Sequence, residues 1–206
     1  MSSQERKQEA PLGAAEGSQN VQARSKIQIK GVVEVPEGVT VSLERGVFTV
    51  QGPKGSLQRK LHAPSVVATV KEGKVEFNAK RKPTLREKKL INTFKAHLRN
   101  MFKGVVEGHS YELKVCSGHF PMTVSLKGDV LEVKNFIGES VPRTLRIGAD
   151  VKVSVNGAQI LVEGIDKEKV GRVAAAIEQL CRRPGFDQRV FQDGIYIVKK
   201  DGKDVA

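Results

Sequence analysis

Arginine, lysine and aromatic side chains are interleaved near the end of the chain, in residues 182–200, which read RRPGFDQRVFQDGIYIVKK. Guanidinium and ammonium groups neutralise phosphates, and aromatic faces stack on bases, so this composition suits contact with RNA. The spacing also fits a strand whose Ile195 and Ile197 dock on a sheet while the charges stay in water. Both interpretations stay open on spacing alone.

Catalytic and metal-binding patterns are the other chemistry to consider. The segment GPKGS, residues 52–56, resembles a phosphate-binding loop but lacks its register and opens no helix, so a hairpin turn is favoured. Cys116 and His119 have a spacing that a metal could use, yet no second pair accompanies them. The histidines are dispersed, and no nucleophile has a patterned base. We therefore predict no catalytic site, no metal and no cofactor.

The charge balance points to the kind of partner. The chain has 206 residues and a formal net charge of +12, an excess that favours a polyanion, nucleic acid first. A membrane surface fits less well, because the basic residues do not form one face of a long amphipathic helix. The sequence shows no apolar run of the roughly 18 residues that a membrane span needs and no secretory signal. We expect a cytoplasmic protein with neither a membrane nor a small-molecule substrate as partner.

The hydrophobic pattern of the first half of the chain changes once, from the spacing of strands to the spacing of a helix. Short β-branched runs separated by turn residues fill residues 27–77, which predicts an antiparallel meander. Thr84 and Glu87 then have the spacing of a capping box, and Gly104 is the expected end of the helix that follows. The apolar stripe of this helix comprises Leu90, Phe94, Leu98 and Phe102.

The second half repeats this order. The tetrapeptide TVSL of residues 40–43 recurs at residues 123–126, within a second set of strand-like runs over residues 111–162. Asp166 is placed to cap a second helix that residues 184–185, Pro-Gly, would end. The apolar face of this second helix comprises Val170, Val173, Ala174, Ile177, Leu180 and Cys181.

These matches indicate an internal duplication. At the same offset Val50 corresponds to Val133, and Gly55 corresponds to Gly138. We predict an α+β fold of two similar tandem modules, each an antiparallel sheet packed against one helix, with a hinge in residues 104–109. The expected division is a flexible N-terminal tail over residues 1–25, a first module over 26–107, a second over 108–186, and a basic C-terminal segment over 187–206 that packs partly on the second module.

Seven motifs in order carry a resemblance to one family. They are VPEGVTV (35–41), VQGPKGSL (50–57), NMFKGVVEG (100–108), SGHFPMTV (117–124), VKNFIGE (133–139), VEGIDKEKVG (162–171) and RVFQDGIYIVKK (189–200). Together they resemble the universal large-subunit ribosomal protein six family, called nine in the older eukaryotic naming. The HFPM and FQDGIY elements are similar to those of its archaeal and eukaryotic branch. The N-terminal tail is longer than this resemblance implies.

The resemblance implies a non-enzymatic constituent of the cytoplasmic large ribosomal subunit. Such a protein binds ribosomal RNA near the sarcin-ricin region, contacts neighbouring ribosomal proteins, and lies transiently close to translational GTPases. The RNA contacts that it implies first are Arg182, Arg183, Arg189, Phe191, Tyr196, Lys199 and Lys200, with Lys54 and Lys134 as weaker choices. Two other classes are an RNA-processing enzyme on the same surface and a protein-interaction adapter outside the ribosome.

Overall fold

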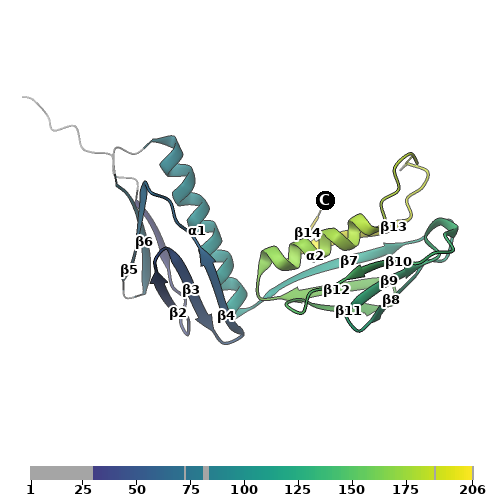
Figure 1. Ribbon diagram of the computed structural model, residues 1–206, viewed down its shortest axis with the longest axis horizontal. Coiled ribbons are helices and arrows are strands. Elements are labelled where there is room, and N and C mark those ends of the chain that lie inside the picture. The colour runs from purple at the N-terminus through teal and green to yellow at the C-terminus, as the bar shows by residue number, and fades with distance from the viewer. Residues whose placement is uncertain (1–29, 72, 81–83, 188, 206) are drawn as a thin grey trace, which may run out of the picture.

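The computed structural model describes residues 30–71, 73–80, 84–187 and 189–205. The tail expected over residues 1–25 lies outside these ranges. Within them the chain forms two α+β modules, which meet at the C-terminal end of the first helix and diverge from there (Figure 1). The predicted duplicated α+β fold is confirmed, although the strands of each module are divided between two antiparallel sheets.

The first module packs one helix against two three-stranded antiparallel sheets. The sheet of order β1-β6-β5 comprises Lys30–Glu34, Lys74–Ala79 and Val66–Lys71. The sheet of order β2-β3-β4 comprises Thr40–Glu44, Val47–Gly52 and Gly55–Lys60. Helix α1, Leu85–Val106, contacts strands of both sheets and so closes the core of the module.

Alternation along the strands directs one set of side chains into this core. The ring of Phe77 on β6 lies 5.9 Å from that of Phe48 on β3 and 5.8 Å from that of Phe94 on α1. The helical stripe predicted from the sequence is buried at Phe94, Leu98 and Phe102, whereas Leu90 is only partly buried. The apolar face of α1 is completed by Ile91, Met101 and Val105.

Helix α1 begins where the sequence predicts and ends later. The Thr84 hydroxyl accepts a hydrogen bond from the Arg86 N–H, and the Glu87 carboxylate accepts one from the Thr84 N–H at 3.0 Å, which confirms the capping box. The predicted end at Gly104 is wrong, because the helix continues to Val106. The left-handed residue that terminates it is Gly108, at φ +83°. None of the helices in the described ranges is both long and apolar enough to cross a membrane.

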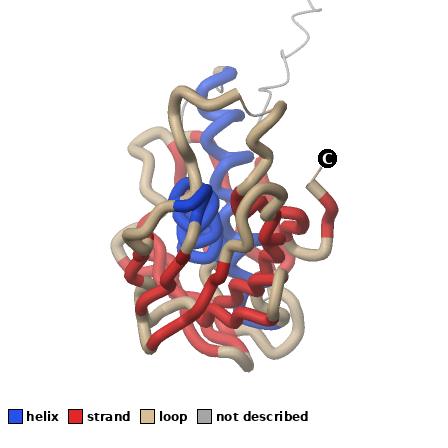
Figure 2. The backbone as a smooth tube through the Cα atoms, turned by 90° about the vertical axis from the view of Figure 1, so that its right-hand side faces the viewer, coloured by secondary structure: helices blue, strands red, loops and turns tan. Residues whose placement is uncertain are grey.

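The second module repeats the plan on a larger sheet. The order β11-β12-β7-β13-β14 comprises Lys152–Asn156, Gln159–Gly164, His109–Cys116, Gly194–Lys200 and Lys203–Asp204. The order β10-β9-β8 comprises Arg143–Arg146, Val130–Lys134 and Thr123–Lys127, and a short 3₁₀ helix, η1, spans Phe136–Gly138. Helix α2, Lys167–Leu180, packs on β7, β12 and β13, and Figure 2 shows it nearly end-on above the strands.

The core of the second module lies between α2 and the sheets. Asp166 caps α2 by accepting a hydrogen bond from the Glu168 N–H at 2.9 Å, as predicted, and the helix ends at Leu180, before the Pro-Gly pair. Val170, Ala174, Ile177 and Cys181 are the fully buried members of the predicted apolar face. Ile195 of β13 is 1% exposed and joins this core, so the C-terminal segment is anchored as a strand.

Strand register reproduces the duplication and shows where it stops. Val41 pairs with Val50 in the first module, and Val124 pairs with Val133 in the second, so the repeated tetrapeptide occupies the same place in both hairpins. Beyond this point the copies diverge. Gly55 opens β4, whereas the corresponding Gly138 ends η1. The second module therefore builds a different structure after its β9.

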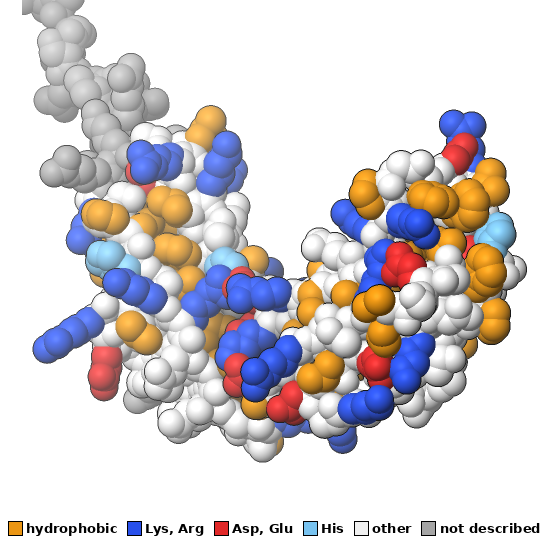
Figure 3. All heavy atoms as spheres, turned by 45° about the vertical axis from the view of Figure 1, so that its right-hand side comes forward, with side chains coloured by type: hydrophobic (Ala, Val, Ile, Leu, Met, Phe, Trp, Pro, Cys, Tyr) orange, Lys and Arg blue, Asp and Glu red, His pale blue; other side chains and the backbone are white. Residues whose placement is uncertain are grey.

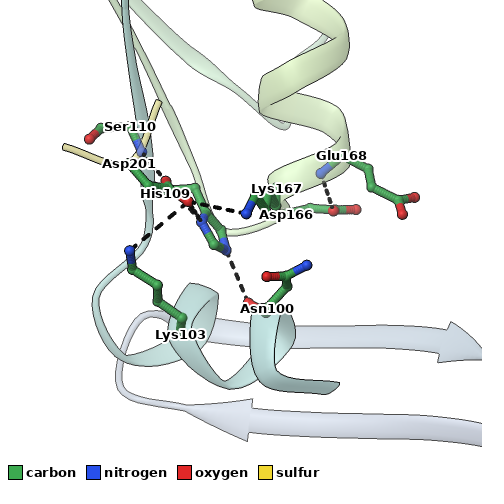
Figure 4. A network of polar contacts seen from close by, with 8 residues as sticks. All are labelled: Asn100, Lys103, His109, Ser110, Asp166, Lys167, Glu168 and Asp201. Atoms are coloured by element: carbon green, nitrogen blue, oxygen red, sulfur yellow. Dashed lines mark hydrogen bonds and ion pairs between the residues drawn. The ribbon is translucent and has the colours of Figure 1, made fainter. Parts of the chain in front are cut away.

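A buried histidine joins the two modules (Figure 4). Only residues 107–108 separate α1 from β7, which is shorter than the predicted hinge. The His109 side chain donates from Nε2 to the Asn100 carbonyl of α1 at 3.0 Å, and its Nδ1 lies 2.9 Å from an oxygen of Asp201. Each ring nitrogen faces an acceptor, so both hydrogen bonds are made when the ring is doubly protonated.

Asp201 brings the C-terminal turn to the same junction. Lys103 of α1 and Lys167 of α2 lie 4.0 and 3.6 Å from its carboxylate. Burial raises the pKa of Asp201, but the hydrogen bond from His109 and the nearby charges outweigh burial, so the net pKa is lowered. An ion pair of 2.7 Å between Arg59 on β4 and Glu168 on α2 adds a second link. These contacts hold α1, α2 and the C-terminal turn together next to residues 107–108, which connect α1 to β7.

Candidate nucleic-acid interface

The segment between α2 and β13, which the structure describes over residues 181–187 and 189–193, forms a largely exposed loop at the end of the second module that lies away from the hinge (Figure 1). We call it the 181–193 loop. Apolar and basic side chains gather on this tip in the space-filling view (Figure 3). The Arg189 side chain is 94% exposed, and Phe186 is 37% exposed. The loop therefore presents to solvent the two kinds of side chain that the sequence suggested for RNA contact.

Stacked rings give the loop a fixed shape. The Phe191 ring lies 5.0 Å from the ring of His119 in a stacked arrangement, and Phe186 meets Phe191 edge-on at 4.9 Å. The Arg183 guanidinium lies over the Phe186 ring, 4.2 Å from its centroid. Aromatic and cation–π pairs of these geometries are attractive beyond the area that they bury. Part of the aromatic surface is thus used to hold the loop, and part stays exposed.

A buried carboxylate ties the loop to the segment before β8. Asp193 accepts hydrogen bonds from the N–H groups of Gly118 and His119 at 2.6 and 3.0 Å, and from His119 Nδ1 at 2.5 Å. Burial raises the pKa of Asp193, but these hydrogen bonds stabilise the ionised form more strongly, and the net pKa is lowered. Asp193 is therefore an anion that orders two neighbouring segments.

Acid is expected to release this anchor. Because the pKa of Asp193 is lower in the folded state than the ordinary value of about 3.9, its stabilising effect is present above that value and is lost as the pH falls through the folded value. Hydrogen exchange at the Gly118 and His119 amides should accelerate below about pH 4 relative to other loops. In Asp193→Asn the amides should exchange fast already at neutral pH, whereas the exposed Asp204→Asn should behave like the parent. Unchanged protection in Asp193→Asn would contradict the anchor.

Arg143 supports the loop from the strand beneath it. Its Nη1 donates to the carbonyl oxygens of Leu180 and Arg182 at 2.7 and 3.1 Å, just after the last turn of α2. The guanidinium also pairs with Glu139 and lies 4.4 Å from the centroid of the Phe136 ring. The chain therefore leaves α2 along a path fixed by hydrogen bonds.

The structure brings together most, but not all, of the residues named from the sequence. The members at the tip are Arg182, Arg183, Arg189, Phe191 and Tyr196. Lys134 lies at the same end, because it pairs with Thr123 next to the segment that Asp193 holds.

Three of the named lysines lie elsewhere. Lys199 and Lys200 are at the other end of β13, where Lys200 pairs with Tyr111 near the hinge. At about 3.3 Å per residue, Lys200 is on the order of 20 Å from the start of the strand. Lys54 also lies at the hinge, with its ammonium hydrogen-bonded to the Glu107 carbonyl. These lysines and the tip form separate basic regions of one molecule.

Sequence reasoning missed several residues that shape the tip. Asp193 and His119 hold the loop, and the exposed Phe120 lies beside it. Phe186 was one of the aromatic residues of the 182–200 stretch, but its contact with Arg183 comes from the structure. From the sequence we considered the His119 side chain only as a metal ligand. In the structure its Nδ1 forms a hydrogen bond with the Asp193 carboxylate. No local signal links His119 with Asp193, because the two residues are 74 positions apart in the sequence.

Together, the fold and the tip define a duplicated α+β protein with exposed aromatic side chains and three arginines at one end of its second module. The family described as ribosomal protein L6 matches residues 35–108 and 120–194, one match in each module. The chain belongs to this family, which confirms the resemblance. The family is one of structural ribosomal proteins, so the chain is not an enzyme.

Curated relatives agree with the archaeal-type assignment. A protein of Methanosarcina mazei named large ribosomal subunit protein uL6 is 44% identical over 173 residues, which cover 84% of this chain and 98% of the relative. Proteins of the same name from Methanobrevibacter smithii and Ignicoccus hospitalis are each 42% identical, over 84% and 85% of this chain and 97% and 96% of the relatives.

Proposed function

We propose that this chain is a structural constituent of the cytoplasmic large ribosomal subunit and binds ribosomal RNA through the 181–193 loop. The observation that carries the proposal is the concentration of arginine and aromatic side chains on a loop that the protein itself holds in shape. RNA recognition uses phosphate neutralisation together with stacking on splayed bases, and this tip supplies groups for both.

The arginines of the tip are available for phosphates. The closest carboxylate contacts of Arg183 and Arg189 are 3.9 Å, to Glu139 and Asp187, and Arg182 has no ion pair among the described residues. Loose ion pairs on the surface contribute little to the stability of the protein, so replacing them with phosphate contacts costs little free energy. A net charge of +12 on the whole chain further favours a polyanionic partner.

The finer assignment is our inference, supported by the resemblance to the family. We infer that the tip lies near the sarcin-ricin region and the site where translational GTPases land, with neighbouring ribosomal proteins on other faces. We also retain the division into modules over residues 26–107 and 108–186, followed by the C-terminal segment 187–206. The end of α1 at Val106 and the start of β7 at His109 support the first of these boundaries.

Salt dependence of RNA binding tests the proposed interface. Replacing Arg182, Arg183 and Arg189 by glutamine removes three cationic groups while the Asp193 anchor stays in place. The slope of log K against log salt should become shallower by about two to three units, because each phosphate contact contributes about 0.7–0.9. The measurement is filter binding of the full chain to large-subunit ribosomal RNA between about 50 and 200 mM salt.

A matched control replaces three lysines of the first module that are far from the tip, Lys60, Lys71 and Lys74, by glutamine. An equal change of slope in both triple variants would show general charge attraction and contradict the assignment to the tip. Sucrose-gradient sedimentation separates the remaining classes. The proposed protein should travel with large subunits, whereas an adapter outside the ribosome should remain in ribosome-free fractions.

A further inference from the structure

A hollow of about 260 Å³ opens beside the 181–193 loop, between the end of α2 and the start of β13. Its lining residues include the aromatic Phe186, Phe191 and Tyr196, the basic Arg182 and Arg183, and the acidic Glu178. The volume is below the roughly 300–1,000 Å³ of pockets for drug-sized ligands, so it suits one planar ring system.

Two of the aromatic walls keep free surface. Tyr196 is 42% exposed and Phe186 is 37% exposed, and the Tyr196 hydroxyl donates to the Gln192 carbonyl at 3.2 Å, which fixes the ring. Phe186 is held by Arg183 on its face and by Phe191 at its edge. A base entering the hollow would therefore meet rings whose rotamers are already fixed, and stacking on such rings requires little further ordering.

The hollow has an acidic residue, Glu178, in its wall and basic residues at its rim. Glu178 lines the hollow and makes no side-chain hydrogen bond or ion pair within the described ranges. Arg182 and Arg183 follow four and five residues later, at the rim, where both are exposed. A carboxylate accepts N–H donors, and the cations suit the phosphates on either side of a base. Guanine presents two adjacent N–H donors on its Watson–Crick edge, and that edge is free only when the base is unpaired.

From this arrangement we propose that the hollow binds one unpaired guanine of the RNA, stacked on Phe186 and Tyr196 with its Watson–Crick edge toward Glu178. The inference rests on the function proposed above and names the RNA feature that the tip recognises. Arg182 and Arg183 hold the flanking phosphates, so sequence recognition and backbone binding are divided between neighbouring side chains.

Short RNA hairpins test this site with the full chain. The probes are a hairpin with a single bulged guanine, the same hairpin with a bulged adenine, and the fully paired hairpin. The parent protein should bind the bulged guanine about tenfold more tightly than the paired hairpin, because one stacked base contributes a preference of this size. Phe186→Leu should reduce that preference to about twofold or less, and Glu178→Gln should remove the preference for guanine over adenine.

Phe120→Leu is the matched control, because Phe120 is an exposed aromatic residue of the same tip that does not line the hollow. It should keep the full preference for the bulged guanine. Equal binding of bulged and paired hairpins by the parent would overturn the guanine site and leave the proposed function standing. Equal loss in Phe120→Leu and Phe186→Leu would also overturn it. Failure to bind any of the hairpins or ribosomal RNA would instead contradict the proposed function.

Discussion

Replacement of Leu98 by alanine is expected to lower the free energy of unfolding by about 2–5 kcal/mol. Leu98 is fully buried in the middle of α1, within the core that both sheets of the first module share with the helix. The shorter side chain loses its transfer free energy and leaves a cavity that the packed rings around it cannot fill completely. Urea unfolding followed by circular dichroism, with the slope m compared between variants, measures this loss.

The control is Leu85→Ala on the same helix, because Leu85 is 76% exposed. Its substitution should change the free energy of unfolding by no more than about 0.5 kcal/mol. The core of Leu98 lies in the first module, so RNA binding by the folded fraction of the Leu98 variant should be unchanged. Similar losses from the two leucine substitutions would contradict the burial that the structure assigns to them.

Replacement of Gly104 by alanine is expected to destabilise the protein by on the order of 2 kcal/mol. Alanine in a helix interior is ordinarily better than glycine by about 1 kcal/mol, so helix propensity alone predicts the opposite sign. The structure reverses the sign because a Cβ at Gly104 would collide with the backbone carbonyl of Ile165, which belongs to the second module. A backbone atom cannot move aside as a flexible side chain can.

Thermal unfolding and a distance measurement together test this second prediction. Spin labels on the exposed faces of the two modules should report a longer or broader distance in Gly104→Ala, since relief of the collision separates Ile165 from α1. Gly148→Ala is the control, because a Cβ at Gly148 meets no atom within 4 Å. A gain of stability in Gly104→Ala, with an unchanged distance distribution, would show that the modules do not approach each other as described.

The polar contacts of His109 and Asp201 lie next to this close approach, because His109 Nε2 would be 3.2 Å from a Cβ at Gly104. His109 and Asp201 join β7 and the C-terminal turn to the Asn100 carbonyl of α1, while Arg59 and Glu168 join β4 to α2. The C-terminal segment therefore has two structural roles. It starts next to the exposed tip and ends in the junction between the modules, so one strand links the proposed RNA contact to the relative position of the two halves.

The sequence predicted helix starts and hairpins well, because these features depend on contacts between residues that are close in the sequence. The capping residues Thr84 and Asp166 need partners only two or three residues away, and both caps are present. Turn residues and β-branched runs predicted the hairpins, and the repeated TVSL tetrapeptide predicted that two of them are equivalent. The predicted helix end at Gly104 relied on the same kind of local signal, because a glycine near the end of an apolar stripe usually marks a helix terminus. Here that prediction was wrong, since the helix continues to Val106.

What the sequence by itself determined about this protein is therefore the duplicated α+β plan, the helix starts, the basic excess and the family, because hydrophobic period, capping and motif order are all local. Only the tertiary structure decided which basic residues act together. It gathers Arg182, Arg183 and Arg189 at the tip, places Lys199 and Lys200 at the hinge, and makes Asp193 and Asp201 anchors of segments distant in sequence. These placements depend on how β13 pairs with β7 and how one module packs on the other, and long-range contacts of this kind leave no periodic signal in a single sequence.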